Sequence, residues 1–298
     1  FHAYAEPGSY MVTLYLESDN GCDSDTAFEV IADPNPIAGF DFGNVCDGLP
    51  MPFNETSTVP LPGVLQLSDW DMGNLTTLND TVLNAYDYST FGPYNVSLAV
   101  VTQHGCTDVI SELVNVHPVP TAEFAFTNVC EDDLANFNDL SSVATGVIEN
   151  WDWIFGNSDL FNGQSPGPQS YPADDLYPIS LTVTSDSGCV NIALDTIEIY
   201  PVPIANFSFD SACFPIGIQF SDLSDQNGAY PITQFSWSFS DGQVSIASSP
   251  LISFDEFGAY SATLLVTNEW GCKGDSMIGD ALVHPLPVSE FDANFGHC

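Results

Sequence analysis

The sequence predicts an all-β protein in which small β-sandwiches repeat in tandem. The first observation is a repeat of about 84 residues, and a repeat of this kind indicates one folded unit per period. The second is alternation of apolar and polar residues over short runs, as in Val96, Leu98 and Val100, which is typical of strands with one buried face. The third is that no helical period extends far enough to compete. The repeat is clearest in the cysteines, at Cys22, Cys46, Cys106, Cys130, Cys189, Cys213, Cys272 and Cys298.

Four landmarks return with the same period. Each unit opens with Pro-x-(Ala/Ser)-x-Phe and later carries a tryptophan, a tyrosine and a Gly-Cys pair. The openings are Pro36, Pro120, Pro203 and Pro287, the tryptophans Trp70, Trp153 and Trp237, and the tyrosines Tyr10, Tyr94, Tyr177 and Tyr260. The landmarks predict three whole repeats at 36–118, 119–201 and 202–285. Residues 1–35 match the second half of a repeat and 286–298 its first strand, so we expect a slice of a longer array.

One unit, 119–201, illustrates the expected strands. Strands are predicted at 121–126, around Leu134 and Phe137, at 151–155, at 177–184 and at 190–200. Gly156-Asn157 supplies a turn after the third of these. About seven short strands in about 84 residues are the pattern of an immunoglobulin-like sandwich.

The motifs resemble those of the polycystic kidney disease (PKD) repeat family. That family is marked by an opening Pro-x-Ala-x-Phe, a Trp-x-Phe-Gly-Asp-Gly strand and turn, and a closing Gly-x-Tyr-x-Val-x-Leu. The middle motif is altered here, for example to Trp153-Ile154-Phe155-Gly156-Asn157, whereas Gly92-Pro93-Tyr94-Asn95-Val96-Ser97-Leu98 keeps the closing one. The resemblance implies immunoglobulin-like sandwiches arranged head to tail as a rod. It also implies a spacer, adhesion module or ligand-binding appendage of a large bacterial surface or secreted protein.

The charge of the chain excludes several partners. Forty acidic residues stand against one basic residue, Lys273, which gives a formal net charge of −39. Such a chain repels nucleic acid and anionic lipid, because phosphate attraction dominates that binding. Hydrophobic residues make up 44% of the sequence, so a folded protein is expected rather than disorder. A trypsin-like protease finds one candidate bond, which predicts resistance to such proteases.

Regularly placed cysteines predict disulfides and an oxidising, extracellular or cell-surface location. Zinc is the rival interpretation, but zinc ligands normally come in pairs two to four residues apart, and no such pair occurs. In the implied sandwich topology the first loop of one repeat meets the late hairpin of the next. That arrangement favours Cys46–Cys189 and Cys130–Cys272, with Cys22, Cys106, Cys213 and Cys298 pairing outside this segment. Bridges within a repeat, Cys46–Cys106, Cys130–Cys189 and Cys213–Cys272, remain the alternative.

Few residues indicate chemistry. No catalytic motif is present, and His117 and His284 occupy one linker position before a proline, so we expect no enzyme. Glu131, Asp132 and Asp133 are candidate calcium ligands, with a solvated acidic loop as the alternative. Thr26, Thr196 and Ser276 look similar to an O-glycan acceptor of exported bacterial proteins. Trp70, Trp153 and Trp237 are expected in the core, and Trp151 and Trp270 are better candidates for exposed contacts.

The expected function is therefore structural. We predict a rigid, disulfide-linked and protease-resistant rod in an extracellular bacterial filament, stalk or giant surface adhesin. Close-set prolines in the linkers, such as Pro118 and Pro120, favour extended and stiff connections. Expected partners are neighbouring repeats, copies of the same chain, glycans or another cell surface, without cofactor requirement or membrane insertion. The alternative is a carbohydrate- or protein-binding appendage of a secreted hydrolase.

Overall fold

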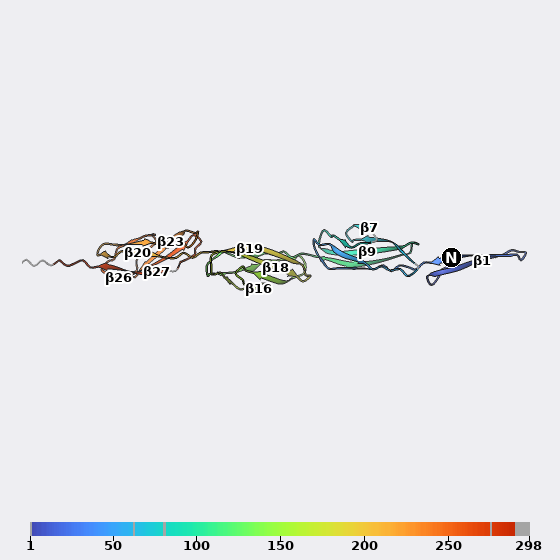
Figure 1. The fold of residues 1–298 in the computed structure, drawn as a ribbon, viewed down its shortest axis with the longest axis horizontal. Coiled ribbons are helices and arrows are strands. Elements are labelled where there is room, and N and C mark those ends of the chain that lie inside the picture. The colour runs from blue at the N-terminus through green and yellow to red at the C-terminus, as the bar shows by residue number, and fades with distance from the viewer. Residues whose placement is uncertain (1, 62, 80–81, 275, 290–298) are drawn as a thin grey trace, which may run out of the picture. The chain divides into compact units, whose positions relative to one another are not determined.

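The computed structural model describes residues 2–61, 63–79, 82–274 and 276–289, and within them the secondary structure is all β (Figure 1). No helix in this part of the chain is long and apolar enough to cross a membrane. The chain divides into two compact units, and the division passes through the second repeat. Unit 1 comprises Phe1–Ala122, Ser141–Trp151 and Thr182–Ile192, and unit 2 comprises Glu123–Leu140, Asp152–Leu181 and Ala193–Cys298.

The first repeat is a sandwich of a three-stranded and a five-stranded sheet. The smaller sheet has the order β3-β5-β8, with β3 Phe40–Phe42, β5 Met51–Glu55 and β8 Ala85–Tyr86. The larger has the order β4-β10-β9-β6-β7, with β4 Val45–Cys46, β10 Thr107–His117, β9 Gly92–Thr102, β6 Leu65–Asp71 and β7 Thr77–Asn79. All pairings are antiparallel except that of β4 with the end of β10.

The third repeat has the same construction. Its smaller sheet is β20-β22-β25, with β20 Phe207–Phe209, β22 Ile218–Asp222 and β25 Leu251–Ile252. Its larger sheet is β21-β27-β26-β23-β24, with β21 Ala212–Cys213, β27 Met277–His284, β26 Gly258–Asn268, β23 Ile232–Phe239 and β24 Val244–Ser245. The identical strand order follows from the shared period of apolar residues and turns.

The second repeat keeps the five-stranded sheet, while its other strands form two short pairs. The sheet order is β12-β19-β18-β15-β16, with β12 Val129–Cys130, β19 Val190–Tyr200, β18 Leu176–Ser185, β15 Ile148–Ile154 and β16 Leu160–Asn162. The pairs are β11 Phe124–Ala125 with β14 Asn138–Asp139, and β13 Leu134–Ala135 with β17 Gln169–Ser170. Three immunoglobulin-like sandwiches therefore follow one another in sequence, as predicted. Before them, β1 Gly8–Glu17 and β2 Asp23–Ala32 form a hairpin.

A tryptophan stands at the centre of each core. Trp70, Trp153 and Trp237 are each about 1% exposed, which confirms their predicted core position. In the second and third repeats the indole N–H donates to a backbone carbonyl, of Gly163 at 3.1 Å and of Ala247 at 2.9 Å. Burying an indole is favourable when its N–H finds a partner, and these two repeats supply one beside the core.

The recurring tyrosines form the corner that is typical of such sandwiches. In each case the phenol hydroxyl donates to the backbone carbonyl four residues earlier. The four donors are Tyr10, Tyr94, Tyr177 and Tyr260, and their acceptors are Glu6, Thr90, Ala173 and Glu256. Because the β1–β2 hairpin carries the same corner, residues 2–35 fold locally like the late hairpin of a full repeat.

A second tyrosine predicts loss of stability at alkaline pH. Tyr88 and Tyr171 are buried and donate to the carbonyls of Met72 and Phe155. Burial raises the pKa of both phenols above the ordinary value of 10. The native state therefore retains these protons above pH 10 where the unfolded chain releases them, so the free energy of unfolding falls as pH rises above 10.

The third repeat has Phe254 at the position that corresponds to Tyr88 and Tyr171, so phenylalanine is the natural replacement for both tyrosines. The free energy of unfolding, measured with urea, should stay constant up to pH 10 and fall above it. Replacing Tyr88 and Tyr171 together by phenylalanine should remove most of that fall. An unchanged alkaline slope in the double variant would contradict this assignment.

Candidate functional site

The most distinctive chemistry of the chain lies where one repeat joins the next. Cys46 bonds to Cys189 with an S–S length of 2.00 Å and a Cα–Cα distance of 5.7 Å. Cys130 bonds to Cys272 with corresponding values of 1.99 Å and 5.6 Å. These are the two pairs that the sequence analysis favoured. Each bond links the early loop of one repeat to the late hairpin of the following repeat.

Local structure brings each early-loop cysteine to the exit of its repeat. β4 runs parallel to the end of β10, so Cys46 lies beside His117, the last residue of that strand. The same pairing sets Cys130 beside Tyr200 and Cys213 beside His284. A cysteine at this position therefore reaches the next repeat without any rearrangement of its own sandwich.

The partner cysteine is held by a tight turn. The Cys189 N–H donates to the Ser185 hydroxyl at 3.1 Å, and the Cys272 N–H donates to the Asn268 side-chain oxygen at 3.0 Å. Equivalent bonds join Cys106 to Thr102 at 3.1 Å, and Cys22 to Ser18. Gly188 and Gly271 have φ of 80° and 88°, a left-handed conformation that glycine adopts without strain. The recurring Gly-Cys pair is thus a turn that presents the thiol.

The junction between the second and third repeats, which lies within unit 2, is also joined by polar contacts. The Asn268 side-chain amide, about 1% exposed, donates to the Pro201 carbonyl at 3.0 Å. The side chain of Asn227 donates to the Val202 carbonyl at 3.0 Å. Gly274 lies so close to the linker that a Cβ there would be 2.1 Å from the Pro203 carbonyl oxygen. Linker residues 201–203 are therefore held directly by the third repeat.

Aromatic side chains cover the same junction. Trp270 stacks on Tyr200 with ring centroids 4.6 Å apart and planes 2° from parallel. Tyr230 packs edge-on against both rings and donates a hydrogen bond to Glu198. That hydrogen bond, together with desolvation and the negative charge of Glu198, raises the pKa of Tyr230 to about 12. Trp270, a candidate for exposed contacts, is 53% exposed yet already has a ring partner from the preceding repeat.

Glu131, in the acidic loop after β12, accepts hydrogen bonds from the backbone at this junction. One Glu131 carboxylate oxygen accepts from the Asp174 N–H at 3.0 Å and the other from the Val202 N–H at 3.1 Å. Asp132 has a φ of 63°, which places it at the turn after β12. Among the described residues, no group of three or more His, Cys, Asp or Glu side chains is arranged to hold a metal ion. Glu131 thus connects the loop to the linker.

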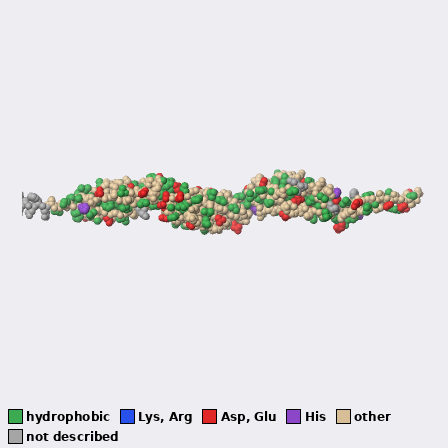
Figure 2. Space-filling view, viewed as in Figure 1, with side chains coloured by type: hydrophobic (Ala, Val, Ile, Leu, Met, Phe, Trp, Pro, Cys, Tyr) green, Lys and Arg blue, Asp and Glu red, His purple; other side chains and the backbone are tan. Residues whose placement is uncertain are grey.

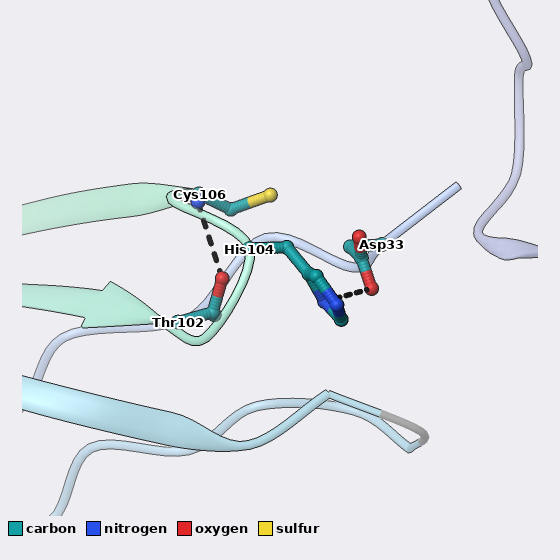
Figure 3. A network of polar contacts seen from close by, with 4 residues as sticks. All are labelled: Asp33, Thr102, His104 and Cys106. Atoms are coloured by element: carbon teal, nitrogen blue, oxygen red, sulfur yellow. Dashed lines mark hydrogen bonds and ion pairs between the residues drawn. The ribbon is translucent and has the colours of Figure 1, made fainter. Parts of the chain in front are cut away.

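A polar contact marks the entry to the first repeat. The His104 imidazole lies 2.9 Å from the Asp33 carboxylate, on the same turn that carries Cys106 (Figure 3). His104 precedes its Gly-Cys pair as Trp270 precedes Gly271-Cys272, so both side chains reach the linker before their own repeat. Cys22, Cys106 and Cys213 are unpaired in this segment, and Cys298 lies outside the described residues.

The remaining sequence candidates are dispersed. Thr26, Thr196 and Ser276 are all exposed, but they do not share one position. Thr26 and Ser276 come four residues after their cysteine, whereas Thr196 comes seven after Cys189. Acidic side chains are scattered over the visible surface rather than gathered around one hollow (Figure 2). His117 and His284 lie on separate repeats beside Cys46 and Cys213.

Comparison with known proteins identifies one module. Residues 201–280 match the family model described as PKD domain. The PKD1 domain of Vibrio anguillarum Epp is 27% identical over 28% of this chain and 96% of its own length, with a TM-score of 0.26. The PKD1 domain from Vibrio cholerae metalloprotease PrtV is 26% identical over 28% and 98%, with a TM-score of 0.25. A 1.5-MDa bacterial ice-binding adhesin is 8% identical over 87% and 99%, with a TM-score of 0.35. None of the curated protein sequences matches the chain.

Proposed function

We propose that this chain, whose residues 201–280 form a PKD domain, is a structural segment of an extracellular bacterial filament, stalk or adhesin. One observation carries the proposal: both disulfides cross a junction between repeats instead of closing a repeat. A bond within one sandwich stabilises that sandwich alone. A bond across a junction limits bending between neighbours, which matters to a protein that must transmit force or hold a reach.

The linkers support the same role. Val116-His117-Pro118-Val119-Pro120 and Ile199-Tyr200-Pro201-Val202-Pro203 contain no flexible spacer, and proline fixes φ near −65°. The second linker is also hydrogen-bonded to Asn268, Asn227 and Glu131. A stiff array of sandwiches would extend by roughly 35 to 40 Å per repeat, from strands of about ten residues.

Location and activity follow from the same features. Disulfides persist in oxidising compartments, and two of them in a PKD-containing chain favour an extracellular protein. The comparisons found PKD and immunoglobulin-like domains and no catalytic domain. The proposed partners are neighbouring repeats and, at the outer surface, other cell-surface molecules.

Small-angle X-ray scattering tests the proposal directly. The oxidised chain should give a narrow, elongated distance distribution, and a variant with Cys46, Cys189, Cys130 and Cys272 all changed to serine should give a broader and shorter one. Circular dichroism of the variant should still report folded sandwiches, since the clusters of buried side chains around Trp70 and Trp237 contain none of these cysteines. The same distance distribution for the folded variant and the parent would show that the cross-junction bonds do not set the shape, and the proposal would fail.

A further inference from the structure

The last strand of each repeat has a largely open edge. In the third repeat, among the strands that the structure describes, only β21 covers the outer side of β27, where it pairs with Val283 and His284. β10 and β19 are covered in the same way, each by a two-residue strand at its end. Residues 277–282 of β27 therefore have no strand beside them on that side within the described part of the chain. An open edge of this kind is a template for another strand.

Hydrogen bonds identify which main-chain groups face the opening. The Ser240 N–H donates to the Ser261 carbonyl, so Ser261 directs its backbone groups toward β23. Asp280 lies opposite Ser261, and its own N–H and C=O therefore point away from β26. Because this direction repeats every second residue, the N–H and C=O groups of Ile278 and Leu282 also point away from β26. The His284 carbonyl accepts from the Phe214 N–H on β21, which agrees with this assignment.

In each of the first two repeats, a carboxylate on the corresponding strand disfavours pairing at that edge. Glu112 lies opposite Val96, on the same face of β10 as buried Val114 and Val116. Asp195 has the corresponding place in β19, six residues after its Gly-Cys cysteine and on the face of buried Ile197. An added strand would bury such an inward-pointing charge, which is costly, and natural sheets use this device to stop edge pairing.

The third repeat has no carboxylate at this position. Gly279 lies opposite Ala262, where Glu112 lies opposite Val96 in the first repeat. The aromatic rings of Phe207 and Phe209 fill the space beneath it, because a Cβ on Gly279 would be 3.2 Å and 3.0 Å from them. On the outer face Ile278 is 65% and Leu282 is 45% exposed, with Asp280 between them.

We propose that the edge of β27 binds an extended, basic segment of another polypeptide by strand addition. Main-chain hydrogen bonds to Ile278, Asp280 and Leu282 would supply affinity, and alternate apolar side chains would cover the two aliphatic ones. The charge selects the partner: the chain carries a formal −39 and a single basic residue, so a second copy is repelled and a basic strand is attracted. A lysine or arginine opposite Asp280 completes a cross-strand pair. This inference goes beyond the structural role and does not depend on stiff junctions.

The test uses the whole oxidised chain and two synthetic peptides, Thr-Val-Thr-Lys-Thr-Val-Thr-Lys and its counterpart with glutamate for lysine. One face of the first peptide carries valine, lysine and valine in turn, to lie opposite Ile278, Asp280 and Leu282. When the lysine peptide is added, hydrogen exchange of the protein's backbone amides, measured by NMR, should slow at Ile278, Asp280 and Leu282. Exchange at the intervening residues of β27 should stay unchanged. Proline at position 278 removes an edge N–H that the sheet does not use. Ile278→Pro should weaken binding at least about tenfold, whereas Ser111→Pro, at the corresponding edge position of β10, should leave it unchanged.

Each alternative outcome overturns the proposal. Equal weakening by Ile278→Pro and Ser111→Pro would show that β27 is not preferred to β10. Unchanged binding by Ile278→Pro would show attraction to the acidic chain as a whole, because the substitution leaves the net charge unchanged. Protection confined to acidic loops would show the same. Equal binding of the glutamate peptide would remove the charge selection, and concentration-dependent dimerisation protecting β27 would make a second copy the partner. Circular dichroism checks that both proline variants remain folded; should Ile278→Pro unfold, Ile278→Glu against Ser111→Glu replaces the pair.

Discussion

Replacing Cys130 and Cys272 together by serine is expected to lower the free energy of unfolding by about 5 kcal/mol. The bond joins residues separated by 142 positions, and a long closed loop restricts the unfolded chain most strongly. The native state should lose less order than this figure suggests, because the Trp270 stack and the Asn268 hydrogen bond remain at the junction. Most of the effect therefore comes from the unfolded ensemble.

Urea unfolding followed by tryptophan fluorescence measures this change. Cys106→Ser is the matched control, since Cys106 lies on the same kind of turn but is unpaired in this segment. The control should unfold like the parent chain. A loss below about 1 kcal/mol in the double variant would contradict the chain-entropy argument.

The Cys46–Cys189 bond offers an internal comparison, with a separation of 143 positions. The entropic contribution is the same for both bonds, so any difference between the two double variants reports the local contacts at each junction.

The second large effect is expected from Trp153→Ala, which should cost about 4 kcal/mol. Trp153 is about 1% exposed and stacks against Phe155 with centroids 5.8 Å apart, while Phe124 meets it edge-on at 5.4 Å. The substitution removes this buried surface and leaves the Gly163 carbonyl without its indole donor. The cavity cannot close easily because strands hold its walls.

Trp270→Ala is the control, since it removes a tryptophan that is 53% exposed. It should cost only about 1 kcal/mol, from the lost stack on Tyr200. Differential scanning calorimetry with urea titration compares the two variants. Equal losses in both would mean that Trp153 is not the centre of the second core.

The strands of the second repeat show how far a sequence pattern reaches. The predicted strand at 190–200 coincides with β19, and 177–184 lies within β18. The predicted strand at 121–126 is shorter in the structure, where only Phe124–Ala125 forms β11. Long alternating runs are recognised because each residue is buried or exposed in turn. Short edge pairs depend on where the facing strand lies, and alternation does not contain that information.

The sequence by itself determined the tandem sandwiches, their tryptophan cores and the Gly-Cys turns, because these depend on contacts within one period and every period repeats them. It also favoured the two cysteine pairs through the topology that the repeat implies. Only the tertiary structure decided that Glu131 accepts a hydrogen bond from the linker and that Trp270 stacks on Tyr200. It also decided that glycine, not a carboxylate, lies opposite Ala262 on the inner face of β27. Those features join residues from different repeats or different sheets, and spacing along one chain does not fix which side chains meet there.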